Sequence, residues 1–179
     1  MKHGLNWVKT TVDSPLGPLL LAASAHGLAG VWFADQRHLP TEGLILGWPS
    51  DARHPVLYAA AQQLARYWTG DWNAFDLPLD FSGGTPFQQS VWQALLSIPA
   101  CQTRRYGELA SQIGRPAAVR AVGAAIGRNP LGIVVPCHRV VGADGSLTGY
   151  AGGLDRKAAL LERERNSGLL QTHSTCHPA

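Results

Sequence analysis

Short apolar runs separated by turn residues open the chain and predict β-strands. These runs are rich in branched and aromatic residues, and the turn sequences PLG and AHG divide them. The predicted strands cover residues 7–14, 18–24 and 28–34. In residues 54–70 the spacing changes to the helical period and Gly70 ends the pattern, which predicts an amphipathic helix. Residues 1–80 therefore predict a small N-terminal α+β domain, a β-sheet with a helix.

Helical spacing dominates the rest of the chain. Residues 76–89 are rich in proline, glycine and aspartate and predict the connection between two domains. Thr85 before Pro86 forms a suitable N-cap and first-turn pair for the helix that follows. We therefore expect a mainly helical C-terminal domain over residues 84–170 and a flexible tail over residues 171–179.

Two further helical segments have the lengths of a helix-turn-helix motif. YGELASQIG ends at Gly114, and after the break GRP the segment AAVRAVGAAIGRN continues in small apolar residues. Those small residues either allow close helix packing or let the helix approach a nucleic-acid backbone, with Arg120 as a long cationic arm. Both explanations can hold on different faces of the helix. Gly123 inside this helix costs about 1 kcal/mol relative to alanine, so we expect the fold or the function to compensate for it.

Positive charge is concentrated in the C-terminal half. Residues 1–83 carry five Lys/Arg and seven Asp/Glu, whereas residues 84–179 carry ten and five, so the halves have net charges of −2 and +5. Nine of the ten cations in the second half are arginines, whose planar guanidinium suits phosphate contacts and base stacking. Charge alone is equally consistent with a solvated basic surface.

Composition disfavours several classes of protein. No stretch approaches the roughly 20 apolar residues of a membrane span, and the N-terminus MKHGLNWVKT lacks the apolar core of a signal peptide. We therefore predict no membrane association and a cytoplasmic location. The three cysteines form no CxxC pair, which argues against a cysteine zinc site.

The segment NPLGIVVPCHRVVGADGS, residues 129–146, carries the candidate chemistry. LGIVV predicts a buried strand that Pro136 ends, which would place Cys137 at a strand end near the floor of a pocket. A free cysteine is most often a small buried hydrophobe. The neighbours His138 and Arg139 can instead favour the thiolate, with help from a distant carboxylate, and make Cys137 a nucleophile. The imidazole can act on the thiol directly or through a water molecule.

Seven motifs occur in the order and spacing of one known family. They are VWQALLSIP, YGELA, RAVGAA, NP, PCHRVVG, GYAGG and KAALLERE, and they cover residues 91–164 densely. On these motifs the chain resembles the O6-alkylguanine-DNA alkyltransferases, also called methylated-DNA-protein-cysteine S-methyltransferases. The N-terminal segment DSPLGPLLLAAS…GLAGVWF also resembles the N-terminal unit of that family, with a less specific pattern.

The resemblance implies a role for each residue that matches a motif. It implies that Cys137 accepts the alkyl group, that His138 is its base through a water molecule, and that Glu164 orients the histidine. Asn129 resembles the hinge residue that holds the active-site turn against the recognition helix, and Tyr106 resembles the phenol that donates a proton to guanine. The other matched positions are Arg120, which would fill the gap left by a flipped nucleotide, Ala121 and Gly123 on the DNA-binding helix, and Val140, Tyr150 and Ala151 in the nucleotide pocket.

The implied function is DNA repair by irreversible transfer of an alkyl group from O6-alkylguanine to Cys137, once per molecule. A cysteine thiolate supplies the soft nucleophile and a tyrosine the proton for the leaving oxygen, and the nucleotide must leave the base stack to be reached. The resemblance also implies a monomer that enters the minor groove of alkylated double-stranded DNA, with no cofactor and no metal. Ala151 stands where many members have serine, which leaves substrate preference and activity on O4-alkylthymine open.

Three other readings compete with this one. A catalytically silent lesion-binding relative would lack the acceptor cysteine, but Cys137 is present. A helix-turn-helix transcription regulator would use Cys137 only structurally and would bind specific sequences without being modified. A cysteine hydrolase would use Cys137, His138 and Glu164 for acyl transfer, but no sequence feature identifies its oxyanion hole. One intact-mass measurement after mixing with alkylated DNA separates these possibilities.

Overall fold

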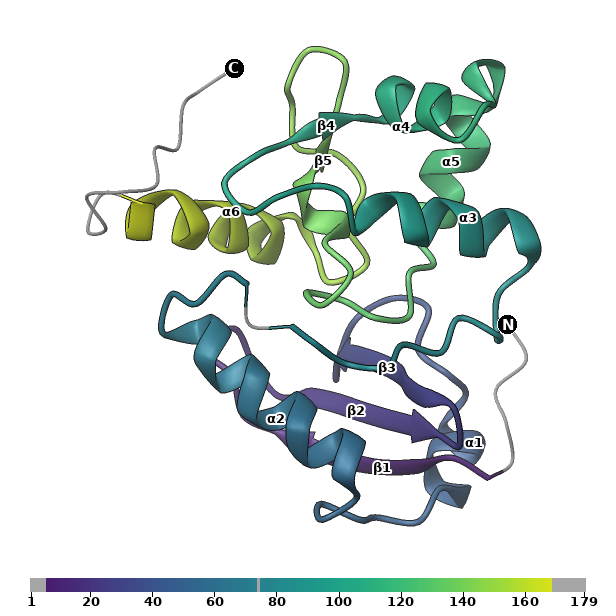
Figure 1. Cartoon of the computed structure of the whole chain (residues 1–179), viewed down its shortest axis with the longest axis vertical. Helices are drawn as coiled ribbons and strands as arrows, with labels where there is room; N and C mark the ends of the chain where they lie inside the picture. Colours follow the sequence, from purple (N-terminus) through teal and green to yellow (C-terminus); the bar gives the residue numbers. More distant parts are fainter. Residues whose placement is uncertain (1–5, 74, 169–179) are drawn as a thin grey trace.

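The computed structural model describes residues 6–73 and 75–168, and the tail predicted over residues 171–179 lies outside this part of the chain. Figure 1 shows a three-stranded sheet with its helices in the lower half of the view and a group of helices above it. The fold is α+β, as the sequence predicts, with the antiparallel sheet first and the helical unit second. One hydrophobic core contains residues of both units, so the two share a packed interface.

The sheet of the N-terminal unit is covered on both faces. Its strands pair antiparallel in the order β1 (Val8–Val12), β2 (Leu19–Ser24) and β3 (Gly27–Phe33). Successive strand residues point to opposite faces, so Leu19 and Leu21 join the main core under α2 (Pro55–Trp68), whereas Leu20 joins a smaller cluster with Trp48. The short helix α1 (Glu42–Gly47) packs on that second cluster and was not predicted. Burial on both faces explains why β2 and β3 are apolar except for Ser24 at the end of β2.

The second unit consists of helices and a short two-stranded parallel sheet. The helices are α3 (Pro86–Leu95), α4 (Tyr106–Gln112), α5 (Val119–Ile126) and α6 (Leu154–Gly168), with one-turn 3-10 helices η1 (Pro116–Ala118) and η2 (Cys137–Arg139). Strands β4 (Arg104–Arg105) and β5 (Val140–Val141) pair in parallel. Thr85 caps α3 as predicted: its hydroxyl accepts from the Gln88 amide at 3.3 Å, and the Gln88 side chain accepts from the Thr85 amide at 2.9 Å.

The predicted strand at LGIVV is wrong. Residues 132–134 form turns, and Ile133 has a positive φ of 69°. Local hydrogen bonds satisfy this backbone, because Val135 N donates to Leu131 O at 2.8 Å and Val134 N donates to Gly132 O at 2.8 Å. A short apolar run has the same sequence signature whether it is a buried strand or a buried turn.

Leu131 alone of this segment pairs with the sheet, through an isolated bridge to Val31 of β3. Val31 N donates to Pro130 O at 2.8 Å, and Gly132 N donates to Val31 O at 3.0 Å. The edge of the N-terminal sheet therefore holds the turn that leads to Cys137, which opens η2 instead of ending a strand. Over residues 6–73 and 75–168, no helix is long and apolar enough to cross a membrane.

Candidate active site

Cys137 follows a turn whose backbone is held by hydrogen bonds to the Asn129 side chain. The Asn129 side chain is buried, its Nδ2 donates to Val135 O at 2.8 Å, and its Oδ1 accepts from Leu131 N at 3.0 Å. Cys137 is a free cysteine with 7% of its surface exposed, and its amide donates to Val135 O at 2.8 Å. Asn129 thus bonds to both ends of the turn, as expected for a residue that fixes the position of the thiol.

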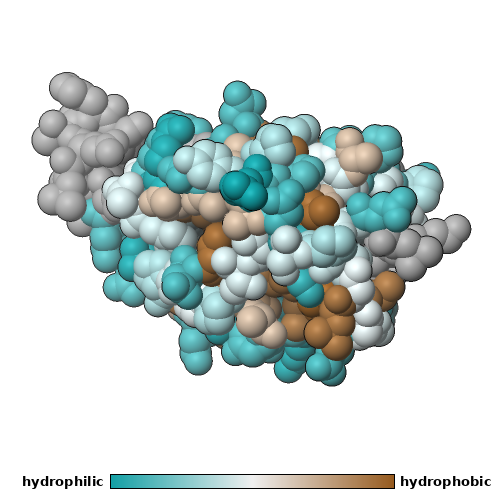
Figure 2. Space-filling model, turned by 90° about the horizontal axis from the view of Figure 1, so that it is seen from below, coloured by the Kyte–Doolittle hydropathy of each residue, from teal (hydrophilic) through white to brown (hydrophobic). Residues whose placement is uncertain are grey.

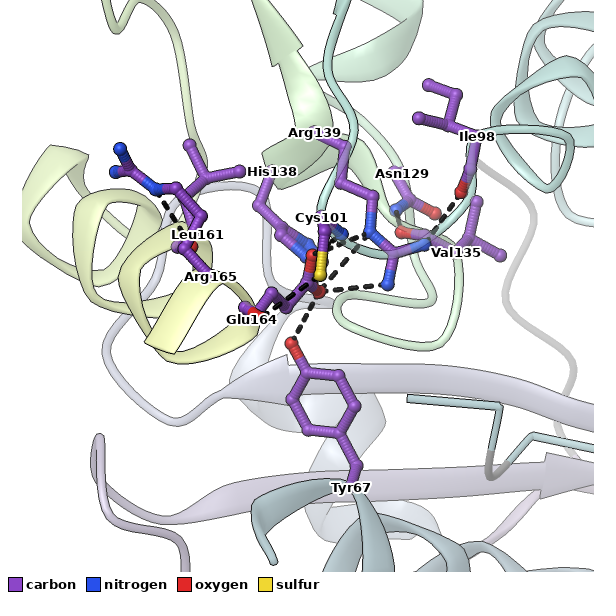
Figure 3. A network of polar contacts seen from close by, with 10 residues as sticks. All are labelled: Tyr67, Ile98, Cys101, Asn129, Val135, His138, Arg139, Leu161, Glu164 and Arg165. Atoms are coloured by element: carbon purple, nitrogen blue, oxygen red, sulfur yellow. Dashed lines mark hydrogen bonds and ion pairs between the residues drawn. The ribbon is translucent and has the colours of Figure 1, made fainter. Parts of the chain in front are cut away.

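The two residues that follow Cys137, His138 and Arg139, belong to a buried network around the Glu164 carboxylate (Figure 3). His138 Nε2 lies 2.9 Å from Glu164 Oε1, and Arg139 donates to both carboxylate oxygens over distances of 2.8 to 3.2 Å. Arg139 Nη1 also donates to Ile98 O at 2.7 Å. The expectation that Arg139 favours the Cys137 thiolate is therefore not supported, since its guanidinium bonds to Glu164 and Ile98.

The hydrogen bonds assign the tautomer of His138. Glu164 is ionised and only accepts, so Nε2 carries the proton of a neutral imidazole and Nδ1 holds a lone pair. His138 is completely buried, and its Nδ1 has no hydrogen-bond partner within the described residues. His138 directly follows the buried Cys137 in the chain, and a nitrogen with a free lone pair is what a general base requires.

Burial and pairing set the charge states at rest. Burial opposes ionisation of Glu164, but the hydrogen bonds and charges of His138 and Arg139 outweigh it and lower the pKa of Glu164 to about 2. Burial lowers the pKa of His138 below its usual value, although Glu164 partly opposes this. Burial also raises the pKa of the Cys137 thiol, against the effects of Asn129 and Lys157. Cys137 is therefore a neutral thiol at rest and needs a base to become a nucleophile.

Tyr106 and Lys157 donate to backbone carbonyls of the segment that follows Cys137. The Tyr106 hydroxyl donates to Thr148 O at 3.1 Å from the start of α4. Lys157 is completely buried, and its Nζ donates to Val140 O at 2.5 Å and to Thr148 O at 2.6 Å. Burial lowers the pKa of Lys157 to about 8, partly opposed by negative charge on Cys137. Thr148 O thus joins Tyr106 to Lys157.

The segment around Tyr150 packs tightly against the N-terminal unit. A Cβ on Gly152 would lie 2.8 Å from the Tyr150 ring and 3.0 Å from the Phe33 ring, so glycine is needed there. Ala151 O accepts a hydrogen bond from Arg37 N at 3.0 Å. Burial raises the pKa of Tyr150 well above its usual value, and negative charge on Cys137 adds to the effect. Tyr150 thus remains a neutral phenol close enough to Cys137 to sense its charge.

The DNA-binding residues predicted on α5 lie apart from this cluster. Arg120 and Ala121 are exposed, and within the described residues Arg120 makes no hydrogen bond or ion pair. Gly123 is half-buried, and a Cβ there would lie 3.7 Å from the Tyr106 ring, an ordinary contact distance. The structure therefore brings Cys137, His138, Glu164 and Asn129 together and leaves Arg120 on the surface.

Sequence reasoning missed two polar members of the site. Lys157 precedes Glu164 by two helical turns, so the spacing of the two on one helix could have placed them on the same face. Tyr67 on α2 donates to Glu164 Oε1 at 2.9 Å, and nothing in the apolar pattern of α2 distinguishes it from a core residue. Within the described ranges, no group of three His, Cys, Asp or Glu residues could hold a metal ion.

Comparisons with known proteins identify the family. Residues 86–166 match the 6-O-methylguanine DNA methyltransferase DNA binding domain, and residues 7–81 match the ribonuclease-like domain of the same proteins. The chain belongs to the 6-O-methylguanine DNA methyltransferase family. A methylated-DNA–protein-cysteine methyltransferase of Mycobacterium tuberculosis is 49% identical over 87% of this chain and 91% of that protein. A protein of the same name from Methanosarcina barkeri is 45% identical over 87% of this chain and 96% of its own length.

Solved structures of the M. tuberculosis O6-methylguanine methyltransferase have the same fold. One has a TM-score of 0.79 at 48% identity and covers 89% of this chain and 93% of its own. A structure of the M. tuberculosis protein in complex with DNA has a TM-score of 0.78 at 48% identity, covering 90% of this chain and 93% of its own. The resemblance drawn from the seven motifs is thereby confirmed at the level of family and fold.

Proposed function

We propose that this protein repairs DNA by transferring the alkyl group of O6-alkylguanine to Sγ of Cys137. Membership of the methyltransferase family supports the activity, and the solved complex of the M. tuberculosis relative with DNA supports DNA as the partner. One observation carries the proposal. The buried free thiol of Cys137 is followed by His138, whose Nδ1 is unpaired within the described residues and whose Nε2 is held by Glu164.

The resting charges determine the order of proton movements. Cys137 begins as a thiol, and its proton passes to His138 Nδ1 through a water molecule. Glu164 stabilises the imidazolium that forms. The thiolate attacks the alkyl carbon, an S–C bond forms and the C–O bond to guanine breaks. The hydroxyl of Tyr106 supplies the proton for the base that leaves, and the products are a thioether on Cys137 and an unmodified guanine.

The wall of the site gives a reason for flipping the nucleotide. Val140 O would accept from the exocyclic amino group of guanine, and Lys157 already donates to this carbonyl. A base within the stack cannot reach a buried carbonyl or thiol, so the nucleotide must be extruded, with Arg120 filling the space it leaves. The small side chains of α5 suit close approach in the minor groove.

A thioether is not readily hydrolysed, so each molecule should react once. The proposal includes action as a monomer in the cytoplasm. O4-alkylthymine carries an equivalent alkyl–oxygen bond, and the assay below applies to duplexes that contain either lesion.

Intact-mass spectrometry of the protein mixed with methylated duplex DNA tests the proposal. The wild-type protein should gain the mass of one methyl group, with peptide mapping locating it on Cys137. Cys137→Ser should gain none while keeping its fold and its DNA affinity, because a serine hydroxyl of similar shape is far less nucleophilic at neutral pH. Methyl transfer to Cys137→Ser, or an unmodified wild-type protein, would remove Cys137 from this role.

A further inference from the structure

Tyr67 connects the N-terminal unit to the reactive centre. The residue lies in the last turn of α2, is completely buried, and its hydroxyl donates to Glu164 Oε1 at 2.9 Å. Figure 3 shows the phenol reaching from the lower unit toward the carboxylate, opposite His138 and Arg139. A residue 97 positions earlier in the chain therefore shares the carboxylate that orients His138.

Aromatic packing fixes the position of the Tyr67 ring independently of its hydroxyl. The ring meets Trp68 and Trp72 edge-on at centroid distances of 5.2 Å and 4.9 Å, and it lies 5.6 Å from Phe75 at 30°. Such contacts hold an aromatic side chain in one orientation. A phenylalanine at position 67 would therefore keep the packing and lose only the hydrogen bond.

Tyr67 can only donate to Glu164. Burial raises the pKa of Tyr67 far above its usual value, and the negative charge of Glu164 raises it further, so the phenol stays protonated. Glu164 is ionised and has no proton to give. The direction of the hydrogen bond is thus unambiguous.

Tyr67 and His138 bond to the same oxygen atom. Glu164 Oε1 accepts from Tyr67, from His138 Nε2 and from Arg139 Nη2. Arg139 Nε donates to both oxygens, and Oε2 also accepts from the Cys101 amide at 3.2 Å. Removing one donor from a completely buried carboxylate leaves negative charge without its partner. The remaining donors on that oxygen, including His138, then take up more of this charge.

We propose that Tyr67 is a positioning residue for alkyl transfer, which acts through Glu164 to keep His138 neutral and aimed at Cys137. The inference rests on the roles proposed above for these three residues. It assigns the N-terminal unit a part in the chemistry, through one hydroxyl, in addition to its part in the hydrophobic core.

The electrostatics give the direction of the effect. Negative charge on Glu164 stabilises protonated His138, and donation from Tyr67 withdraws some of that charge from the shared oxygen. Loss of the hydroxyl should therefore raise the pKa of His138. Besides Glu164, the charged groups that act on the imidazole are Arg139 on η2 and Lys157 on α6, and a change at Tyr67 leaves both in place.

Single-turnover methyl transfer from methylated duplex DNA, measured across pH, tests the inference with Tyr67→Phe. The transfer rate needs neutral His138, so it falls at low pH as the imidazole gains a proton. In Tyr67→Phe this acid limb should move to higher pH, because the imidazole becomes more basic. The rate on the plateau should fall by about tenfold, because a carboxylate that has lost one of its anchoring hydrogen bonds no longer holds His138 in one orientation.

Two variants on the same helix serve as controls. Tyr58→Phe removes a hydroxyl from a tyrosine that is 58% exposed and should leave the rate and the pH profile unchanged. Leu64→Ala removes a side chain that is 1% exposed, so it should lower the melting temperature without moving the acid limb. If Tyr67 only stabilises the fold, Tyr67→Phe should behave like Leu64→Ala, with a lower melting temperature and an unchanged acid limb. If Tyr67 positions Glu164, the acid limb should move.

A second replacement keeps the test decisive if Tyr67→Phe folds poorly. 3-Fluorotyrosine at position 67 retains the ring and the hydroxyl, but its more acidic hydroxyl donates more strongly. The acid limb should then move to lower pH, opposite to the effect of Tyr67→Phe. A wild-type acid limb in the folded Tyr67→Phe variant, or in the fluorotyrosine protein, would overturn the inference.

The outcomes separate this inference from the proposed function. If wild-type protein transfers no methyl group, or if Glu164→Gln reacts at the wild-type rate, the proposed function or its roles are wrong. If Cys137→Ser is inert and Glu164→Gln is slow, but Tyr67→Phe has the wild-type pH profile, only the inference about Tyr67 is wrong.

Discussion

Glu164 and Arg120 lie in the same helical unit but in opposite environments. Glu164 is fully buried, and its carboxylate accepts from Tyr67, His138, Arg139 and a backbone amide before any DNA is present. Arg120 is exposed and makes no hydrogen bond or ion pair within the part of the chain that the structure describes. The difference teaches that the fold preorganises the groups around Glu164, whereas it leaves Arg120, the side chain that we propose for DNA contact, without a partner within the described residues.

The largest effect on the transfer rate should follow from replacing Glu164, the buried member of this comparison. Glu164→Gln removes the charge that stabilises the His138 imidazolium, and the single-turnover rate should fall by about 100-fold or more. The same change leaves Arg139 buried without a counter-charge, so the free energy of unfolding should fall by about 3 kcal/mol. Glu162→Gln, on an exposed position of the same helix, is the matched control for urea unfolding and transfer kinetics. An unchanged rate in Glu164→Gln would mean that the carboxylate is only structural.

The same carboxylate determines how stability depends on acid. The pKa of Glu164 is about 2 in the folded protein and 4.5 as a reference, so ionised Glu164 favours the folded state above pH 4.5. This contribution is lost as pH falls from about 4.5 toward 2. His138 acts in the same direction, since its pKa is lowered by folding and acid favours the state that can protonate it. In Glu164→Gln, urea unfolding should therefore depend less on pH in the acid range.

Arg120→Ala tests the exposed member of this comparison. If Arg120 fills the base stack, the variant should transfer methyl groups from saturating duplex DNA about tenfold more slowly but react normally with free O6-methylguanine, which needs no flipping. Simple loss of a phosphate contact would instead weaken DNA binding and lower its salt slope by about one, with little change at saturation. Arg165→Ala, exposed on α6, is the matched control. Equal slowing with both substrates would contradict the stacking role.

The secondary-structure elements also differ in how well the sequence predicts them. The three strands of the N-terminal sheet, helix α2 and the Thr85 cap were predicted from local sequence patterns, and they agree with the structure. The strand predicted at LGIVV was wrong because an apolar run indicates burial. It does not show whether the backbone hydrogen bonds are local or pair with another strand. The helix α1 is only six residues long and has too few positions to show a period.

Within the site, local sequence was informative only for neighbours. Cys137 and His138 are adjacent, so their chemistry could be considered together, but Glu164 was joined to them through a family resemblance and not through any local pattern. The sequence also placed Arg139 beside the thiol, whereas the fold turns its guanidinium to Glu164. Tyr67 was out of reach for the same reason, because only tertiary packing brings α2 to α6.

The smallest expected effect concerns the small residues of α5, where close packing and close approach to DNA are the competing explanations. A Cβ on Gly123 would lie 3.7 Å from the Tyr106 ring, so the fold itself has room for alanine. Gly123→Ala should therefore raise the free energy of unfolding by about 1 kcal/mol through helix propensity. If the glycine exists for the approach of DNA, the same methyl group should weaken duplex binding several-fold.

Urea unfolding and fluorescence anisotropy with a labelled duplex measure the two effects of Gly123→Ala separately. Gly43→Ala in α1, where a Cβ would meet nothing within 4 Å, should add stability without changing DNA affinity. Unchanged affinity in Gly123→Ala would contradict the DNA-approach explanation, and a loss of stability would favour close packing against Tyr106 instead. A more stable protein that binds duplex DNA less well would show that α5 gives up helix stability for its partner, whereas Glu164 gains its partners from the fold.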